Sequence, residues 1–423
     1  MRKRIHKNYG LGNSVGWTAA LLLCAGGAGA QEQAATTEAG GGALQEVTVT
    51  ATRREESLSK VPISITALTQ AGLDDRGIKD FQQIARFTPG VNFDNSGTNN
   101  IAIRGISGTG GAGTTGIYLD DTPIQMRALA FNPDEALPKS FDIERVEILR
   151  GPQGTLFGAG SEGGTVRYIT VQPSVTTTSM YSREEVSYTQ DGAPSWEAGG
   201  AIGGPIIPGV FGARIAVSYR RDGGYIDDIN PVTLQSTEKN ANFRNTLLLR
   251  LAGLWQINDK WSATPSIYYQ DQYRNDIDNY WPLYSNPDDG KFVNADPTQR
   301  RVPDRFYLTA LKIKGDVGFA DLISNTSYYH RKEQSGYEGT LYNLGFYQLY
   351  AFPGNDLLDA QGIHLPPGAQ NYTSPSTVDN GQQNITQEFR LQSNDPAARL
   401  LWTAGVFLSV NRQTYLEQIH DPL

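Results

Sequence analysis

The second half of the chain, from about residue 176, alternates short and long connections between strand patterns. Runs of alternating apolar and polar residues there predict nine strands, which are 178–189, 195–204, 213–221, 242–257, 261–273, 305–315, 321–333, 385–393 and 399–415. The first connection is short, and the later ones alternate between short and long in the order 205–212, 222–241, 258–260, 274–304, 316–320, 334–384 and 394–398. Short turns at one end and long loops at the other are typical of a transmembrane β-barrel. A soluble β-sandwich also has many strands, but its architecture gives no reason for this alternation.

The predicted strands are also long enough to cross a thin bilayer at a tilt, which takes roughly 9–11 residues. In lipid, only a closed barrel gives every strand N–H and C=O group a partner. The composition agrees with many strands and turns, because 46 Gly and 22 Pro stand against only 3 Met. We therefore predict an antiparallel transmembrane β-barrel over residues 176–423.

The first thirty residues have the features of a secretory signal peptide. Four basic residues precede an apolar stretch that runs from about Trp17 to Ala28, and Ala28-Gly29-Ala30 provides a cleavage site. The apolar stretch is too short to span a bilayer as a helix, which takes about 20 residues. A buried helix of a soluble domain is the alternative interpretation. We predict that residues 1–30 are removed on export.

The predicted mature chain is acidic and contains no cysteine. Removal of four basic residues and no acidic residue from totals of 36 and 44 leaves 32 basic and 44 acidic residues, a net charge of −12. This excess of acidic residues argues against nucleic acid as a partner. The single cysteine, Cys24, lies in the predicted signal peptide, so disulfides are not expected to hold the exported protein together.

A short strand pattern follows a small, polar lead. Residues 31–43 are small and polar and are predicted to be disordered. Valines then alternate with threonines in "EVTVTA", which consists of Glu46, Val47, Thr48, Val49, Thr50 and Ala51. The pattern fits an edge strand of the next domain, and it equally fits a strand that is added to the sheet of a partner protein.

Residues 61–175 combine short strands with a little helix. The predicted strands are 62–68, 101–106, 116–121, 145–150 and 165–170. A helix is predicted over 77–87, where apolar residues recur every three positions until Pro89-Gly90 ends the pattern. Such a mixture predicts one small α+β domain. Within it, Asp120-Asp121 is expected to form a solvated turn.

Three glycines of this domain, Gly158, Gly160 and Gly163, have the spacing of a dinucleotide-binding loop. In such a loop a strand enters the glycine turn and a helix leaves it, so that the helix N-terminus meets the phosphates. Here the preceding strand ends early, at Arg150, and the residues that follow predict another strand. A nucleophile elbow at Ser161 fails for the same reason. We expect these glycines to allow tight turns between strands.

Taken together, several stretches resemble the TonB-dependent outer-membrane receptor family. "EVTVTA" is similar to the TonB box of that family, and two stretches near the end, "NITQEFRLQS" and "LLWTAGVFLS", are similar to its barrel strands. The stretches "IAIRGI", "GIYLDD" and "VEILRGPQGTLFGAGSEGGTVRYIT" are similar to its plug domain. Many members carry an Arg-Asn pair after the first glycine of "GAGSEGG", and its absence here suggests a subgroup and leaves the ligand open.

The resemblance implies a flexible lead with a TonB box over 31–60, a plug domain over 61–175 and a barrel over 176–423. It also implies a 22-stranded barrel with the plug in its lumen. The predicted strands occupy about 28 residues each, so a complete barrel would need roughly 600 residues after position 175. The expected fold is therefore an α+β plug domain followed by an incomplete antiparallel transmembrane β-barrel. We accordingly expect the sequence to be a fragment or the product of a truncated reading frame.

The function implied by the resemblance is energised uptake of a scarce ligand, most often a ferric siderophore, across the cell outer membrane. The implied partners are the TonB energy-coupling complex, which would contact residues 46–51, outer-membrane lipid and the small-molecule ligand. A carbohydrate or cobalamin receptor of the same family is an alternative. A passive porin or an adhesin is a further alternative, which the plug motifs oppose. A sigma-regulating receptor would need a longer lead than residues 31–43.

The resemblance also implies pairs between plug arginines and barrel glutamates. Arg104 and Arg150 each follow an apolar strand and precede a glycine, and Glu388 is similar to a barrel partner. A partly desolvated pair of this kind would be stronger than a pair on the surface. The alternative is that these charges are solvated in a wet lumen.

The sequence shows no constellation for catalysis or for a cofactor. Glu144 and Glu147 lie on one predicted strand and face opposite sides, and the predicted mature chain has only three widely spaced histidines. We therefore expect neither an enzyme nor a bound metal, and an exported enzyme is disfavoured. The residues that contact the ligand are not identified. The longest loop does carry a group that fits either a ligand site or an ordinary loop cluster: Tyr342, Phe346, Tyr347, Tyr350 and His364.

Overall fold

In the computed structural model of the protein, the described residues are 47–94, 100–108, 113–125, 137–340, 342–343, 358–359, 362–363, 372–395 and 397–421. Residues 1–46, which include the predicted signal peptide, the polar stretch 31–43 and Glu46, lie outside them. The loop cluster also lies outside, except for Tyr342. No helix in the described ranges is both long and apolar enough to cross a membrane.

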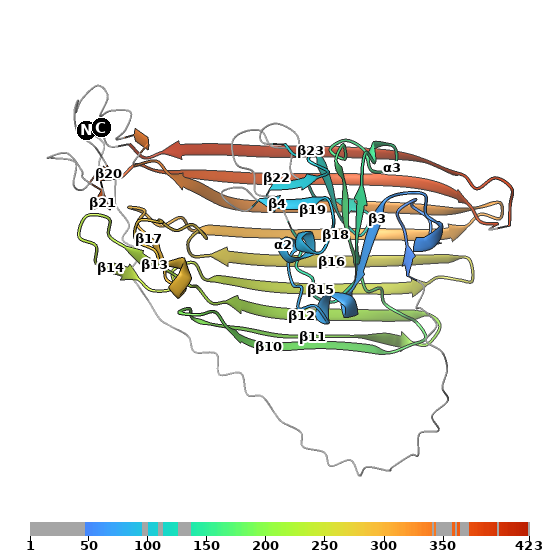
Figure 1. Ribbon diagram of the computed structural model, residues 1–423. Coiled ribbons are helices and arrows are strands. Elements are labelled where there is room, and N and C mark those ends of the chain that lie inside the picture. The colour runs from blue at the N-terminus through green and yellow to red at the C-terminus, as the bar shows by residue number, and fades with distance from the viewer. Residues whose placement is uncertain are drawn as a thin grey trace, which may run out of the picture. The chain divides into compact units, whose positions relative to one another are not determined.

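Nine antiparallel strands form one long sheet, in which the order of the strands is their order along the chain (Figure 1). They are β10 (Ser179–Tyr188), β11 (Pro194–Ile207), β12 (Phe211–Asp222), β15 (Arg244–Gln256), β16 (Trp261–Arg274), β18 (Val302–Asp316), β19 (Ala320–Glu338), β22 (Pro375–Ser393) and β23 (Thr403–Ile419). Each overlaps one strand expected from the sequence. Because β10 and β23 are the two edges, the sheet is open over the described residues, which confirms the predicted incomplete barrel.

The exposed face of the long sheet is apolar and its covered face is polar, which is the reverse of a sheet in a soluble protein. On β15, Leu249 and Leu251 are 38% and 53% exposed, whereas Arg250 between them is 4% exposed. Alternate residues of a strand point to opposite faces, so one face is apolar and uncovered. Its exposed residues on the other strands include Ile215, Val217, Ile267, Leu311 and Phe389. The covered face carries many polar residues, among them Arg214, Ser218, Gln270, Asn325, Ser327, Asn384 and Thr386.

The connections of the long sheet alternate in length as predicted, and the long ones carry structure of their own. Their short elements are β13 (Ile226–Ile229), β14 (Ser236–Glu238), η2 (Pro287–Asp289), β17 (Phe292–Asn294), β20 (Leu358–Asp359) and β21 (Gly362–Ile363). β13 pairs with β14 of its own connection and with β17 of the next one. Two long connections are therefore tied together.

The longest connection is shorter than the sequence predicted. β19 continues to Glu338 and β22 begins at Pro375, and these two residues pair with each other. The expected loop over 334–384 is therefore wrong at both ends. In the first half of β22, "PSTVDNGQQN", Val378 is the only large aliphatic residue, so there is no apolar alternation by which the sequence could have shown a strand.

A compact domain, residues 47–171, precedes the long sheet. Its main sheet has the order β3-β8-β9-β6-β7, with bounds β3 (Ile65–Thr69), β6 (Thr115–Leu119), β7 (Thr122–Pro123), β8 (Ile143–Arg150) and β9 (Gly164–Thr170). Two small pairs accompany it: β1 (Thr48–Val49) with β2 (Glu56–Ser57), and β4 (Val91–Asp94) with β5 (Asn100–Ile103). The helices are η1 (Leu58–Lys60), α1 (Gln70–Asp74), α2 (Phe81–Arg86) and α3 (Gly154–Phe157). This is the α+β domain expected from the sequence.

The predicted helix over 77–87 is present but shorter, as α2. Asp80 caps it by accepting a hydrogen bond from the Gln83 N–H, which delays its start beyond residue 77. Its inner face buries Phe81 and Ile84. α1 was not expected from the sequence pattern, and its single turn is capped by Thr69.

The glycine run leads from one strand to another, as predicted. Gly158 and Gly160 have φ angles of +71° and +83°, a conformation that costs glycine little and other residues much more. α3 ends at Phe157, before the run, and β9 follows it from Gly164. No helix begins in the run, so no helix N-terminus is available there for a phosphate.

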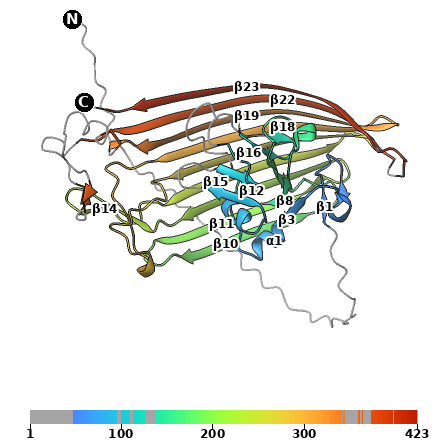
Figure 2. The same cartoon turned by 45° about the horizontal axis from the view of Figure 1, so that its top comes forward.

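The compact domain lies against the polar face of the long sheet, which curves around it (Figures 1 and 2). Close approach needs small residues in the sheet. A Cβ at Gly199 of β11 would lie 2.4 Å from the ring of Phe141 in the compact domain. A few apolar side chains of the long sheet join the core of the compact domain, among them Leu248, Tyr268, Phe306 and Tyr329.

Candidate functional site

The leading segment, residues 47–54, is folded against the compact domain. Thr48 and Val49 pair with Ser57 and Glu56, and Val49 and Ala51 are fully buried. Their apolar neighbours are Val61, Tyr118, Leu149 and Phe157. Of the residues expected to contact TonB, Glu46 lies outside the described ranges, and Val47, Thr48 and Thr50 are not buried. In this arrangement the segment cannot offer its whole length to a partner.

Thr50 anchors the leading segment to a buried carboxylate, Glu147 of β8. The Thr50 N–H donates to Glu147 Oε1 over 2.8 Å. Arg145 Nε and Arg167 Nη1 also donate to this carboxylate, each over 2.8 Å, and Arg167 Nη1 reaches the Thr50 carbonyl oxygen at 2.7 Å. Glu147 is fully buried, so its charge depends on these donors. Glu144, in contrast, is exposed.

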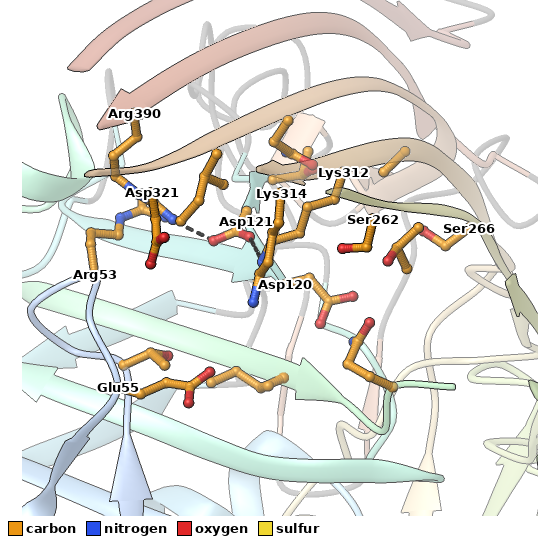
Figure 3. A pocket seen from close by; sticks show the side chains of 18 of the residues that line it. Arg53, Glu55, Asp120, Asp121, Ser262, Ser266, Lys312, Lys314, Asp321 and Arg390 are labelled. Carbon is orange, nitrogen blue, oxygen red and sulfur yellow. Dashed lines mark hydrogen bonds and ion pairs between the residues drawn. The ribbon is translucent and has the colours of Figure 1, made fainter. Parts of the chain in front are cut away.

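Arg53 connects the leading segment to a turn of the compact domain. Its backbone has a φ of +65°, and its guanidinium lies 4.3 Å from the centre of the Phe157 ring. Arg53 Nη1 pairs with Asp121 Oδ1 at 3.3 Å. Lys312 of β18 pairs with the other oxygen of Asp121 at 2.6 Å. Asp121 therefore joins the leading segment to the long sheet, and we call Arg53, Asp121 and Lys312 the latch (Figure 3).

The expectation that Asp120-Asp121 is a solvated turn is wrong. Asp121 is 9% exposed, and Asp120 accepts hydrogen bonds from the backbone and hydroxyl of Thr170. Burial opposes the charge of Asp121, but Lys312 and the neighbouring arginines outweigh it and hold the pKa of this carboxyl well below 3.8. The sequence showed a polar turn, but its cationic partners lie at distant positions along the chain.

The residue after the latch arginine is held by the long sheet. Arg54 Nη2 donates to the Ser393 carbonyl oxygen over 2.8 Å, and Arg54 Nη1 donates to the Trp402 carbonyl oxygen over 3.2 Å. Gln392 Nε2 donates to the Arg53 carbonyl oxygen over 2.6 Å. The leading segment is therefore attached both to the compact domain and to the connection between β22 and β23.

Other ion pairs between the compact domain and the long sheet mostly have their acid in the compact domain. Asp142, 1% exposed, accepts from Arg214 Nε of β12 over 2.8 Å, and Arg250 Nη1 of β15 lies 3.9 Å from it. Asp74 pairs with Arg183 of β10 at 3.3 Å. Lys79 and Glu185 form a pair of the opposite sense.

The structure does not bring Arg104 or Arg150 to Glu388. Arg104 occupies a turn with a φ of +53°, and Arg150 Nη1 donates to the Pro89 carbonyl oxygen over 2.8 Å. Glu388 of β22 pairs with Arg390, two residues along its own strand, at 2.9 Å. Within the described residues no ion pair joins Glu388 to either arginine. The pairing that the sequence suggested stays a prediction.

A cavity of about 790 Å³ lies beside the latch, between the compact domain and the long sheet (Figure 3). Thr48, Thr50, Arg53 and Arg54 of the leading segment line it, together with residues of β16, β18 and β22. In the described part of the chain, no group of three or more His, Cys, Asp or Glu side chains could hold a metal ion.

Comparison with known proteins shows which proteins the chain is similar to. The family model of the TonB-dependent receptor plug domain matches residues 57–165. The chain is 32% identical to the pesticin receptor of Yersinia pestis over 193 residues, which are 44% of this chain and 27% of the relative. It is 26% identical to the ferripyoverdine receptor of Pseudomonas aeruginosa over 239 residues, which are 54% of this chain and 28% of the relative. The chain thus covers less than a third of the length of these relatives.

Solved structures share the fold. The ferric yersiniabactin uptake receptor of Yersinia pestis superposes with a TM-score of 0.64 at 18% identity, over 85% of this chain and 50% of that one. The ferripyoverdine receptor of Pseudomonas aeruginosa, solved with ferripyoverdine bound, superposes with a TM-score of 0.63 at 17% identity, over 89% of this chain and 46% of that one. These relatives are named as receptors, which agrees with the expectation that the chain is not an enzyme.

Proposed function

The chain belongs to the TonB-dependent receptor family, and we propose that it forms the plug and part of the barrel wall of a receptor that imports a ferric siderophore. The compact domain is the plug and the long sheet is the wall. The observation that carries the proposal is the attachment of the leading segment to both: Thr50 holds the plug through Glu147, and Arg53 holds the wall through Asp121 and Lys312. A pull on this segment would therefore act on the contact between plug and wall.

The outer membrane is the environment that the wall fits. Its uncovered face is apolar and its covered face is polar, which is the distribution of a barrel that meets lipid outside and encloses a wet lumen. A passive porin would leave the polar face open to water. Here the plug occupies that face, with Phe141 seated over Gly199 and Asp142 paired with Arg214. This occupation favours gated uptake over passive diffusion.

The relatives support an iron chelate as the cargo. Their names refer to pesticin, ferripyoverdine and ferric yersiniabactin, and another relative, in Escherichia coli, is named as a ferrichrome outer-membrane transporter and phage receptor. Carbohydrate and cobalamin receptors of the same family remain the competing class. Growth of a strain that lacks the receptor, on a panel of ferric siderophores, carbohydrates and cobalamin, separates these classes.

Energy would enter through TonB, which we propose pairs with residues 46–51 as an added strand. Strand addition needs free backbone N–H and C=O groups. The segment is already paired with β2, where the Val47 carbonyl oxygen accepts from the Leu58 N–H, and the Thr50 N–H is held by Glu147. The leading segment must therefore leave its present position before TonB can bind. The latch sets how easily it does so.

The test is a proline at the centre of the segment. Val49→Pro removes a backbone donor from the added strand, so uptake of radioactive iron from the ferric siderophore should be abolished while binding to cells persists. Val49→Ala keeps the donor and should import at nearly the normal rate. Normal uptake by Val49→Pro would contradict strand addition at these residues.

A further inference from the structure

The cavity beside the latch has the size and lining of a binding site for a small molecule. Its volume of about 790 Å³ falls within the range of roughly 300–1,000 Å³ that small-molecule sites occupy. On the wall side, β16 contributes a row of hydroxyl groups from Ser262, Thr264 and Ser266. These alternate residues lie on one face of the strand, so their hydroxyls line the cavity together.

Basic residues outnumber acidic residues around this cavity, although the whole chain carries a net charge of −8. The basic residues are Arg53, Arg54, Arg145, Arg167, Arg250, Lys260, Lys312, Lys314 and Arg390. The acidic residues are Glu55, Asp120, Asp121, Glu144, Asp316 and Asp321. The described lining therefore has three more basic than acidic groups, although Arg167, Arg250 and Arg390 pair with carboxylates outside it, namely Glu147, Asp142 and Glu388.

Most of the acidic groups are already engaged. Asp121 is held in the latch, Asp120 accepts from Thr170, Glu144 pairs with Arg145, and Asp316 accepts from the Gly318 N–H. The Lys314 backbone pairs with the neighbouring strands, but its ammonium group makes no hydrogen bond or ion pair with the described residues. It lies two positions from Lys312 on β18, and both lysines extend from the wall into the cavity (Figure 3).

We propose that this cavity binds the cargo on its way through the receptor, as a site for an anionic, oxygen-rich chelate held by Lys314 and the hydroxyl row of β16. The proposal rests on the uptake function and adds the chemical class of the ligand and a location beside the leading segment. Lys312 is occupied by Asp121 in the present arrangement. Opening of the latch frees Lys312 for the ligand, so departure of the leading segment and stronger binding of the anion are coupled.

The electrostatic part of the proposal is tested with a cysteine in the cavity. Ser266→Cys is made in the receptor with Cys24→Ser, and the thiol is labelled in outer membranes with a negatively charged or a positively charged methanethiosulfonate. Both rates are divided by those of Ser236→Cys, an exposed residue of β14. Negative reagent should be favoured, and Lys314→Met should reduce this preference about threefold, since one nearby charge is removed. Lys332→Met, on the outer face of β19, is the matched control and should have no effect.

The binding part is tested by protection of the same cysteine. Citrate, a trivalent carboxylate, should slow labelling by a neutral reagent, whereas glucose at the same concentration should not, and Lys314→Met should weaken the protection by citrate. If Ser266→Cys does not fold, Ser262→Cys in the same row replaces it. Equal effects of citrate and glucose, or a preference for the positive reagent, would overturn the proposal. Iron uptake is measured separately, so a charge-selective cavity in a receptor that imports no iron would refute the uptake function and not the anion site.

Discussion

The interior of the plug and its contact with the wall are built from different interactions. The interior is mostly aliphatic, with Leu73, Ile78, Ile84, Ile103, Ile117 and Ile148 buried in one cluster. The contact with the wall relies on separate ion pairs, such as Asp142–Arg214 and Asp121–Lys312, and on a few apolar side chains. Burial of a continuous apolar core favours one folded unit, whereas ion pairs can exchange partners with water. The plug can therefore keep its fold while its contact with the wall changes.

The largest effect is expected inside the plug, at Glu147. Glu147→Gln leaves Arg145 and Arg167 without their shared carboxylate, and removal of one partner of a buried pair costs about 3–5 kcal/mol. The melting temperature of the purified receptor measures the loss. Glu144→Gln, on the same strand but exposed, should change it little. Similar melting temperatures for the two variants would show that the interior does not depend on its buried charge.

A smaller effect is expected where the plug meets the wall, at Gly199. In Gly199→Val the added side chain would collide with Phe141, and overpacking of this kind costs about 1–3 kcal/mol. The plug can respond by moving away from β11, so the strain should appear as faster protease cleavage of the plug and not as loss of the wall. Gly200→Val is the control, because a Cβ at Gly200 meets no atom within 4 Å. Equal cleavage of both variants would contradict the close contact.

Individual ion pairs across the contact should contribute at most as much as this packing contact. A double-mutant cycle of Asp142→Ala and Arg214→Ala should give a coupling energy of about 1–3 kcal/mol. The same cycle on Arg104 and Glu388, between which the described residues show no ion pair, tests the predicted pairing, and a value near zero would count against it. Coupling between Arg104 and Glu388 would mean that the lock suggested by the sequence forms in another state of the receptor.

The smallest effect is expected when the pH is lowered moderately. Because the pKa of Asp121 in the folded protein lies below 3.8, its ionic contacts are fully present above that ordinary value and are lost only as the pH falls through the lower, folded pKa. A spin label at Thr48→Cys should therefore keep the same mobile fraction from pH 7.5 to 5. Its mobility should rise only below about pH 4. The Asp121→Asn variant should show the mobile state at every pH. In the protein with Asp121, a rise of the mobile fraction between pH 7 and 5 would mean that another titratable group holds the segment.

The sequence predicted the elements of the fold better than the contacts between them. All nine long strands and the alternation of their connections followed from local patterns, because apolar and polar residues alternate along each strand. The first half of β22 did not, since Val378 is its only large aliphatic residue. The latch was also missed, because Asp121 and Lys312 are 191 positions apart and nothing in either neighbourhood specifies the other. The expected pairs between plug arginines and a wall glutamate came from resemblance, whereas most pairs found here place the acid in the plug.

The anchor at Glu147 has a mechanical consequence. Tension applied at the N-terminal side of the leading segment meets the hydrogen bond from the Leu58 N–H to the Val47 carbonyl oxygen and two residue pairs between β1 and β2 before it reaches Thr50. From there the load passes to β8, which is not an edge strand but lies between β3 and β9. The force is therefore shared between two strand ladders, and an edge strand is not peeled away. The anchor should rupture at a lower force than the sheet. A single pull would therefore detach the leading segment, or move the plug as a rigid body, before the plug unfolds.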